Sequence, residues 1–195
     1  MMKAIQFIRN SSEAGAAVDV ELPLPVAGGH DLLVKIEAIA MNPVDYKVRP
    51  AEGADPKTLG FDAAGAVVGV GDEVTLFAEG DKVYFAGDVT RPGTNAEYQL
   101  VDERIVAKRP ATLDAVKSAA LPLTALTAWE SLFDRLGIDF DNADGNAGKS
   151  LLIIGGAGGV GSMAMQLAKL AGLTVIATAS RSESSEWCRK LGADP

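Results

Sequence analysis

Residues 151–169 read LLIIGGAGGVGSMAMQLAK and place five glycines within positions 155–161. The apolar run at residues 150–154 shows no alternation, which is typical of a buried parallel strand. Beyond the glycines, apolar residues recur at helical spacing from Val160 to Ala171, and a β-branched run follows at residues 174–178. The order of strand, glycine-rich turn, helix and strand predicts a βαβ unit.

The glycine spacing Gly156-x-Gly158-x-x-Gly161 matches the dinucleotide-binding fingerprint. In that fingerprint one glycine permits a tight turn, another lets backbone approach a pyrophosphate, and the third lets the helix pack closely on the strand. The helix N-terminus would also present unpaired N–H groups to the phosphates. The residues predicted to contact a cofactor here are Gly156, Ala157, Gly158, Gly159, Val160 and Gly161. The alternative is a glycine-rich turn that only permits tight packing.

The type of cofactor is predicted from the end of the second strand. An acidic residue about 20 residues past the first glycine would bind the ribose 2′-hydroxyl of NAD, but residues 177–181 read ATASR and hold no acid. Ser180 and Arg181 could instead hold a 2′-phosphate, the arginine through its charge and fork geometry, which favours NADP(H). In the alternative, Ser180 and Glu183 form a capping box for the next helix and Arg181 is only solvated.

The first part of the chain alternates short strands with turns rich in Gly, Pro and Asp. The predicted strands span residues 3–7, 31–39, 63–70, 82–86 and 96–101, an all-β pattern that suggests a small barrel. From about residue 121 the apolar period changes from 2 to 3.6. We therefore predict one domain over residues 1–122 and a second over residues 123–195.

The second domain is predicted to begin with an amphipathic helix. Its apolar face would comprise Trp129, Leu132, Phe133 and Leu136, which lie at i, i+3, i+4 and i+7. Thr127 and Glu130 make a possible capping box that would start this helix. A polar linker is expected at residues 139–148, and a short helix at residues 184–191.

Composition narrows the classes of function. Apolar residues make up 48% of the chain, enough for a globular core, and the net charge of -8 argues against a nucleic-acid partner. Cys188 is the only cysteine and His30 the only histidine, so an internal disulfide and a Cys/His metal cluster are excluded. We expect His30 to be a solvated loop residue. No apolar run suggests a membrane span or signal peptide, and we expect a cytoplasmic protein with a small-molecule substrate.

Seven short motifs besides the glycine cluster carry a family resemblance. They are NPVD at residues 42–45, GFDAAG at 60–65, GDKV at 80–83, GTNAEY at 93–98, LPLT at 121–124, TAW at 127–129 and LGAD at 191–194. Together they resemble the medium-chain dehydrogenase/reductase superfamily, and most closely its quinone oxidoreductase-like branch. The resemblance implies a mixed α and β fold, with a GroES-like β-barrel catalytic domain followed by an incomplete Rossmann domain and an active site between them.

The resemblance also bears on zinc. Zinc alcohol dehydrogenases of this superfamily carry a Cys at the position of Asn42 and a His-Glu pair at Phe61-Asp62. Zinc needs soft S or N ligands, usually three from the protein at a catalytic site, and neither Asn42 nor Phe61 supplies one. We therefore predict no metal, although relatives are often labelled zinc-type alcohol dehydrogenase-like.

Site residues follow from the resemblance as expectations. It implies that Asn42 and Thr127 lie near the nicotinamide, that Asp45 is a structural or relay group, that Tyr46 donates to the substrate and that Phe61 lines an apolar pocket. Each has a plainer alternative: a turn before Pro43 for Asn42, an N-cap for Thr127, a surface aromatic for Tyr46 and a core position for Phe61. For Asp62 the plainer alternative is a hydrogen bond to local backbone.

The expected activity is zinc-independent, NADPH-dependent reduction of quinones or α,β-unsaturated carbonyls. The alternatives are a zinc-dependent alcohol dehydrogenase and a non-enzymatic NADPH-binding protein. Because a Rossmann sheet needs two mononucleotide-binding halves and this sequence holds two strands of one half, we expect an N-terminal fragment that is weak or inactive alone. The full-length protein is expected to be a homodimer.

Overall fold

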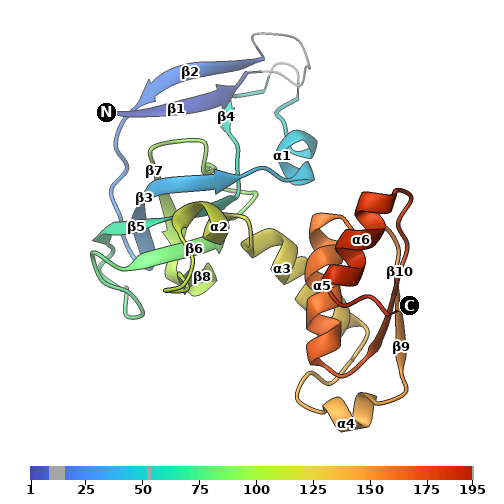
Figure 1. Ribbon diagram of the computed structural model, residues 1–195. Coiled ribbons are helices and arrows are strands. Elements are labelled where there is room, and N and C mark those ends of the chain that lie inside the picture. The colour runs from blue at the N-terminus through green and yellow to red at the C-terminus, as the bar shows by residue number, and fades with distance from the viewer. Residues whose placement is uncertain (9–15, 52–53, 195) are drawn as a thin grey trace. The chain divides into compact units, whose positions relative to one another are not determined.

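The computed structural model describes residues 1–8, 16–51 and 54–194. Its contacts divide the chain into two compact units, Met1–Leu123 and Thr124–Pro195. The first unit is mainly β and the second is mixed α and β (Figure 1). None of the described helices is both long enough and apolar enough to cross a membrane.

Two antiparallel sheets build the first unit. The larger has the strand order β7-β3-β5-β6-β8, and the smaller has the order β2-β1-β4. The strands are β1 (Met2–Phe7), β2 (Ala17–Leu22), β3 (Asp31–Ala40), β4 (Lys57–Thr58), β5 (Asp62–Val70), β6 (Lys82–Ala86), β7 (Tyr98–Asp102) and β8 (Val106–Lys108). Inward-facing residues of the larger sheet, including Leu32, Val34, Val67 and Val83, form a buried core.

The five strands predicted for this unit are present with ends shifted by two residues at most. Strands β2, β4 and β8 were not predicted. Strands β4 and β8 are too short to give a recognisable alternation in the sequence. The side chains of β2 alternate between exposed and half-buried, so this strand has no buried face that a run of apolar residues would indicate. Ala96, predicted to start a strand, instead forms an isolated bridge to Ala4.

Short helices join the strands of this unit and lead into the second. They are α1 (Pro43–Lys47), the 3-10 turn η1 (Glu103–Ile105), α2 (Ala115–Ala119) and α3 (Pro122–Trp129), which continues as a π-helical segment η2 (Glu130–Arg135). The capping box predicted from Thr127 and Glu130 is wrong, because α3 starts five residues before Thr127. Pro122 starts this helix, and its fixed φ suits the first helical position.

The second unit contains the predicted βαβ unit. Its elements are α4 (Ala143–Asn146), β9 (Ser150–Ile153), α5 (Gly159–Leu170), β10 (Thr174–Ala177) and α6 (Ser182–Lys190), and β10 pairs with β9 in parallel. The expected complete burial of the first strand is wrong. Leu151 and Ile153 pack on the core, whereas Leu152 is 59% exposed, because β9 has a packed layer on one face only.

The predicted polar linker is also structured. Helix α4 lies within residues 139–148, and the side chain of Asn146 is completely buried. Its Nδ2 donates to the carbonyl oxygens of Asp139 at 2.7 Å and Ala171 at 2.9 Å. Asn146 therefore ties this segment to the end of α5, because a buried amide needs such partners.

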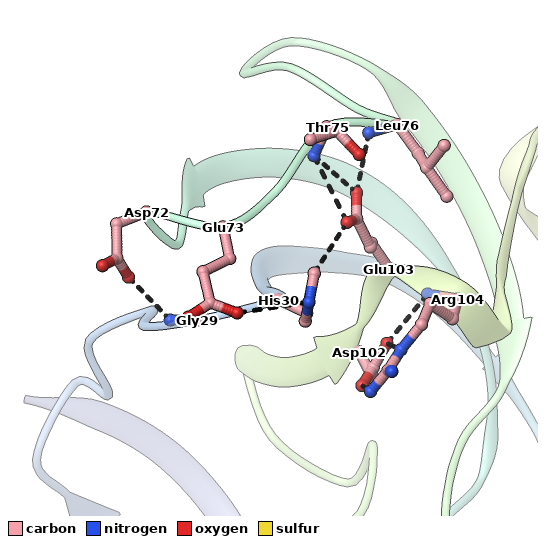
Figure 2. Close-up of polar contacts among 9 residues, drawn as sticks. All are labelled: Gly29, His30, Asp72, Glu73, Thr75, Leu76, Asp102, Glu103 and Arg104. Atoms are coloured by element: carbon pink, nitrogen blue, oxygen red, sulfur yellow. Dashed lines mark hydrogen bonds and ion pairs between the residues drawn. The ribbon is translucent and has the colours of Figure 1, made fainter.

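One end of the larger sheet is held by a buried carboxylate, Glu103 (Figure 2). Glu103 is 2% exposed and accepts the backbone N–H groups of Thr75, at 3.0 Å to Oε2, and Leu76, at 2.7 Å. His30 Nδ1 lies 3.0 Å from Glu103 Oε1, and His30 Nε2 lies 3.2 Å from Glu73 Oε2. His30 lies in a turn with its side chain 37% exposed, as a loop residue, but two carboxylates also flank its ring, which was not predicted.

Candidate functional site

The glycine loop joins β9 to α5 in the second unit. Gly155 has a φ of 68°, a left-handed conformation that glycine adopts without strain. Its N–H donates to Thr178 Oγ1 at 2.9 Å, and the N–H of Gly156 donates to the Thr178 carbonyl at 3.0 Å. Thr178, which follows β10, thus holds the start of the loop in place.

Two glycines of the loop are required by close packing. A Cβ on Gly156 would lie 2.8 Å from the Cβ of Ala177, and one on Gly161 would lie 2.6 Å from the carbonyl oxygen of Gly156. A Cβ on Gly158 would meet nothing closer than 3.4 Å. Gly156 and Gly161 therefore bring the helix close to the sheet, while Gly158 leaves the loop surface open for another molecule.

The loop leads directly into the first turn of α5. Gly158 is the N-cap, so the N–H groups of Gly159, Val160 and Gly161 have no partner within the helix. Gly158, Gly159 and Val160 are exposed. This arrangement of backbone donors at a helix N-terminus suits a phosphate group, and the loop residues present fit a dinucleotide.

The end of β10 presents Ser180 and Arg181, both exposed. Arg181 is the N-cap of α6 and makes no side-chain capping bond, so the alternative capping box of Ser180 and Glu183 is wrong. The guanidinium group of Arg181 makes no ion pair or hydrogen bond with any residue that the structure describes. Its charge is therefore open to an anion.

In the first unit, Asn42 and Asp45 form the start of α1. Asn42 is the N-cap, Pro43 is the first helical residue, and Asn42 and Asp45 make a reciprocal capping box. The backbone N–H of Asn42 donates to Asp45 Oδ2 at 2.6 Å. Asp45 thus serves the local structure, whereas Tyr46 on the next position is 56% exposed.

The side chain of Asn42 also reaches a second carboxylate, that of Asp62. Asn42 Nδ2 donates to Asp62 Oδ2 at 2.9 Å, and the backbone N–H of Leu123 donates to Asp62 Oδ1 at 2.9 Å. Asp62 is the first residue of β5 and is 1% exposed. Its register partner on β3 is Ala40, two residues before Asn42, which explains how the two side chains meet.

The pKa of Asp62 is raised to about 6. Burial is the main cause, because a carboxylate removed from water is more easily neutralised, and the negative charge of Asp45 adds to the effect. The hydrogen bonds from Asn42 and Leu123 oppose the shift without cancelling it. A carboxyl group that titrates near neutral pH beside a candidate catalytic residue is a feature of functional sites.

The remaining predicted residues, Phe61 and Thr127, differ in burial. Phe61 is 2% exposed, at a core position of the first unit. Thr127 is exposed within α3, and its carbonyl oxygen accepts the hydroxyl of Ser131 at 2.6 Å. Thr124 was not predicted as a loop neighbour, yet a Cβ on Gly159 would lie 3.0 Å from its Cγ2. Asn42, Asp45, Tyr46 and Asp62 thus lie in the first unit, and the glycine loop lies in the second with Thr124 and Thr127.

The residues at the positions of the zinc ligands do not fit that metal. Asn42 and Asp62 offer an amide and a carboxylate engaged with each other, and Phe61 offers no ligand atom. Within residues 1–8, 16–51 and 54–194, no three His, Cys, Asp or Glu side chains are arranged to hold a metal ion.

Two models of known protein families match parts of the chain. The model of the alcohol dehydrogenase GroES-like domain matches residues 28–111, and that of the zinc-binding dehydrogenase family matches residues 159–195. These are the barrel and nucleotide-binding parts that the motifs imply. The chain belongs to the medium-chain dehydrogenase/reductase superfamily.

Relatives within this superfamily carry different labels. A zinc-type alcohol dehydrogenase-like protein of Staphylococcus aureus is 54% identical over 87% of this chain and 51% of its own length. A chloroplastic quinone-oxidoreductase of Triphysaria versicolor is 36% identical over 100% of this chain and 60% of its own length. The chain thus spans about half of the length of the curated relatives that it matches.

Solved structures of the superfamily share the fold. An alcohol dehydrogenase superfamily protein from Novosphingobium aromaticivorans is 39% identical with a TM-score of 0.87, over 100% of this chain and 58% of that one. A mycobacterial protein solved in complex with NADPH is 30% identical with a TM-score of 0.83, over 100% of this chain and 57% of that one. The mixed fold of a GroES-like domain and a partial Rossmann-like region is confirmed.

Proposed function

We propose that this chain serves the zinc-independent, NADPH-dependent reduction of quinones or α,β-unsaturated carbonyls. The observation that carries the proposal is the Asn42–Asp62 hydrogen bond, which stands where the zinc enzymes of the superfamily place a metal ligand. When bound, NADPH would supply a hydride, so the residues of the protein need only bind, orient and donate hydrogen bonds.

The cofactor is proposed to bind at the glycine loop. The open surface at Gly158 and the N–H groups of the first turn of α5 would take the pyrophosphate. The exposed guanidinium of Arg181 and the hydroxyl of Ser180 would take the 2′-phosphate that distinguishes NADPH from NADH. A relative solved with NADPH supports this choice.

The substrate class follows from what the first unit can stabilise. Without a Lewis acid, an alkoxide that develops during alcohol chemistry has no strong partner. A quinone or enone spreads the incoming negative charge onto a conjugated oxygen, which hydrogen bonds alone can stabilise. Tyr46 is exposed on α1, four residues after Asn42, and is proposed to donate such a bond.

Cofactor choice can be tested by calorimetric titration with NADPH and NADH. We expect Arg181→Ala to weaken NADPH binding about tenfold, corresponding to about 1.4 kcal/mol, and to leave NADH binding nearly unchanged. Arg189→Ala is the matched control, because Arg189 is also exposed on α6. Equal losses for the two cofactors, or equal losses in the two variants, would contradict the assignment of Arg181.

The reaction itself can be tested by following NADPH oxidation with a quinone and an enone, with and without a chelator. We expect chelator-resistant turnover of at least one of these substrates. Tight binding of NADPH without turnover of either would favour a non-enzymatic role. One zinc per chain together with chelator-sensitive alcohol oxidation would instead favour an alcohol dehydrogenase.

A further inference from the structure

Asn42 is held through both its backbone and its side chain. Its Nδ2 donates to Asp62 Oδ2 at 2.9 Å. Its backbone N–H donates to Asp45 Oδ2 at 2.6 Å, and its carbonyl oxygen accepts the N–H of Asp45 at 3.0 Å. The backbone of Asn42 is thus fixed by Asp45, and its side-chain amide is oriented by Asp62.

The Nδ2 atom of Asn42 carries two hydrogens, and the residues that the structure describes accept one of them. An amide nitrogen can donate two hydrogen bonds, and among the described residues Asp62 is the partner of Nδ2. Asn42 is half-buried, so part of this residue still faces solvent. That second N–H is a donor with a fixed direction, suited to an oxygen that gains negative charge.

We propose that Asp62 is a positioning residue, which holds the Asn42 amide so that its second Nδ2 hydrogen is donated to the carbonyl oxygen of a bound ligand. The assignment of Asn42 to the reaction rests on the proposed function, whereas the anchoring itself does not. A carboxylate serves this role because a charge-assisted hydrogen bond is stronger and directs the donor more firmly than a neutral one. Its second oxygen is occupied by the N–H of Leu123, which keeps the carboxylate from turning.

Protonation of Asp62 would weaken the anchor, because the charge assistance of the hydrogen bond is then lost. The strand residues opposite Asp62, Ala40 on β3 and Ala86 on β6, carry no charge. The charged group that acts on Asp62 is Asp45 on α1, whose negative charge favours the protonated form. The donor geometry of Asn42 is accordingly expected to depend on pH.

The first test observes the side-chain amide signals of Asn42 by nuclear magnetic resonance, in the 195-residue chain without ligand. We expect these signals to shift with a midpoint near pH 6, the pKa of Asp62. The midpoint should fall in Asp45→Asn, and the transition should vanish in Asp62→Asn. Asp55→Asn, which changes an exposed aspartate of the same unit, should leave the midpoint unchanged. Signals that do not respond to pH, or a transition that survives Asp62→Asn, would overturn the proposal.

A second variant covers the case in which Asp62→Asn does not fold. Asn42→Ser keeps a capping residue but removes the amide donor to Asp62. Since that donor lowers the pKa of Asp62, the carboxyl carbon signal of Asp62 should titrate at a higher pH than in the parent chain. An unchanged titration would show that the Asn42–Asp62 contact is not made.

The ligand is tested by adding NADPH, NADP-ribose without its nicotinamide, or a quinone alone to the same sample. A further shift of the Asn42 amide signals with NADPH but not with the truncated nucleotide would identify the nicotinamide carbonyl as the acceptor. A shift with the quinone alone would identify the substrate carbonyl. A shift with none of them would overturn the donor role of Asn42, even if quinone turnover is observed.

In turnover experiments, Asp62→Asn should lower kcat about tenfold with little change in KM and should flatten the pH profile around pH 6. An effect on KM alone would contradict a role in positioning a donor for the reacting oxygen. Absence of any quinone turnover by the parent protein would contradict the proposed function, but it would leave the anchoring test by magnetic resonance intact.

Discussion

A buried carboxylate lies near each end of strand β5, Asp62 at its start and Glu103 of η1 near its other end, and the two are built for different purposes. Asp62 starts the strand, and the loop that follows its last residue, Val70, supplies Thr75 and Leu76 to Glu103. With nine residues in β5, the two ends lie roughly 25 Å apart at about 3.3 Å per residue. Both side chains are at least 98% buried, so burial alone does not distinguish them.

The difference lies in the donors that each carboxylate receives. Burial works to raise the pKa of Glu103, but the N–H groups of Leu76 and Thr75 together with His30 outweigh it, so the pKa lies below its ordinary value. At Asp62, burial and the charge of Asp45 outweigh two donors, and the pKa rises to about 6. A carboxylate that is stabilised as an anion serves the fold, whereas one kept near neutrality can respond to a ligand or a proton.

The largest expected effect is the loss of stability when Glu103 is neutralised. Glu103→Gln leaves two backbone N–H groups competing for one oxygen in a buried site, so the melting temperature should fall by about 5 °C or more. Glu73→Gln, which changes an exposed partner of the same histidine, should shift the melting temperature by only about 1 °C. Equal effects of the two substitutions would show that Glu103 is not the structural group.

The second expected effect is a pH dependence of stability that originates at Asp62. Because its folded pKa of about 6 exceeds the ordinary value of 3.8, the folded protein binds more protons between these pH values. The contribution of Asp62 to the free energy of unfolding therefore falls as pH rises through this window. The melting temperature of Asp62→Asn minus that of the parent chain should be a few degrees higher at pH 8 than at pH 4.5. A difference that is independent of pH would contradict the raised pKa.

Glu103 should show the opposite dependence on pH. Its pKa lies below the ordinary value of 4.5 in the folded protein, so its contribution to stability is present above pH 4.5 and is lost as pH falls through the folded pKa. Thermal unfolding of Glu103→Gln at a series of pH values below 5 should therefore show less acid destabilisation than the parent chain. Identical acid sensitivity of the two proteins would contradict this assignment.

A smaller effect than that of Glu103→Gln is expected when His30 is replaced. Its Nδ1 contributes one of the contacts to Glu103, but the backbone donors of Thr75 and Leu76 remain when the ring is removed. His30→Gln should therefore lower the melting temperature by only about 1–3 °C, measured at pH 7. A loss as large as that of Glu103→Gln would make His30 the principal group of this cluster.

The sequence predicts one candidate site better than the other for a physical reason. The glycine loop, the strand before it and the helix after it are adjacent in the chain, so the spacing of Gly156 and Gly161 alone indicates their packing. Asp62 receives hydrogen bonds from residues 20 and 61 positions away, and Glu103 from residues 27 and 28 positions away. Such partners are brought together by the tertiary fold, and no local pattern in the sequence reports them.

The wrong prediction of where helix α3 starts has a similar origin. Thr127 and Glu130 have the spacing of a capping box, but Pro122 already starts α3 and the helix continues past both residues as a π-helical segment. Likewise Asn42 and Asp45 were predicted from a family motif, while for the carboxylate that anchors Asn42 a bond to local backbone was the only role considered. A carboxylate at the start of an apolar strand such as β5 is the signal in the sequence that could have indicated it.

The most direct test of this account follows the carboxyl carbon signals of Asp62 and Glu103 in one pH titration of the 195-residue chain. We predict that Asp62 titrates with a midpoint near pH 6 and that Glu103 titrates below pH 4.5. Midpoints in the reverse order, or both at the ordinary values of an exposed Asp and Glu, would contradict the division of these two carboxylates into a functional and a structural group.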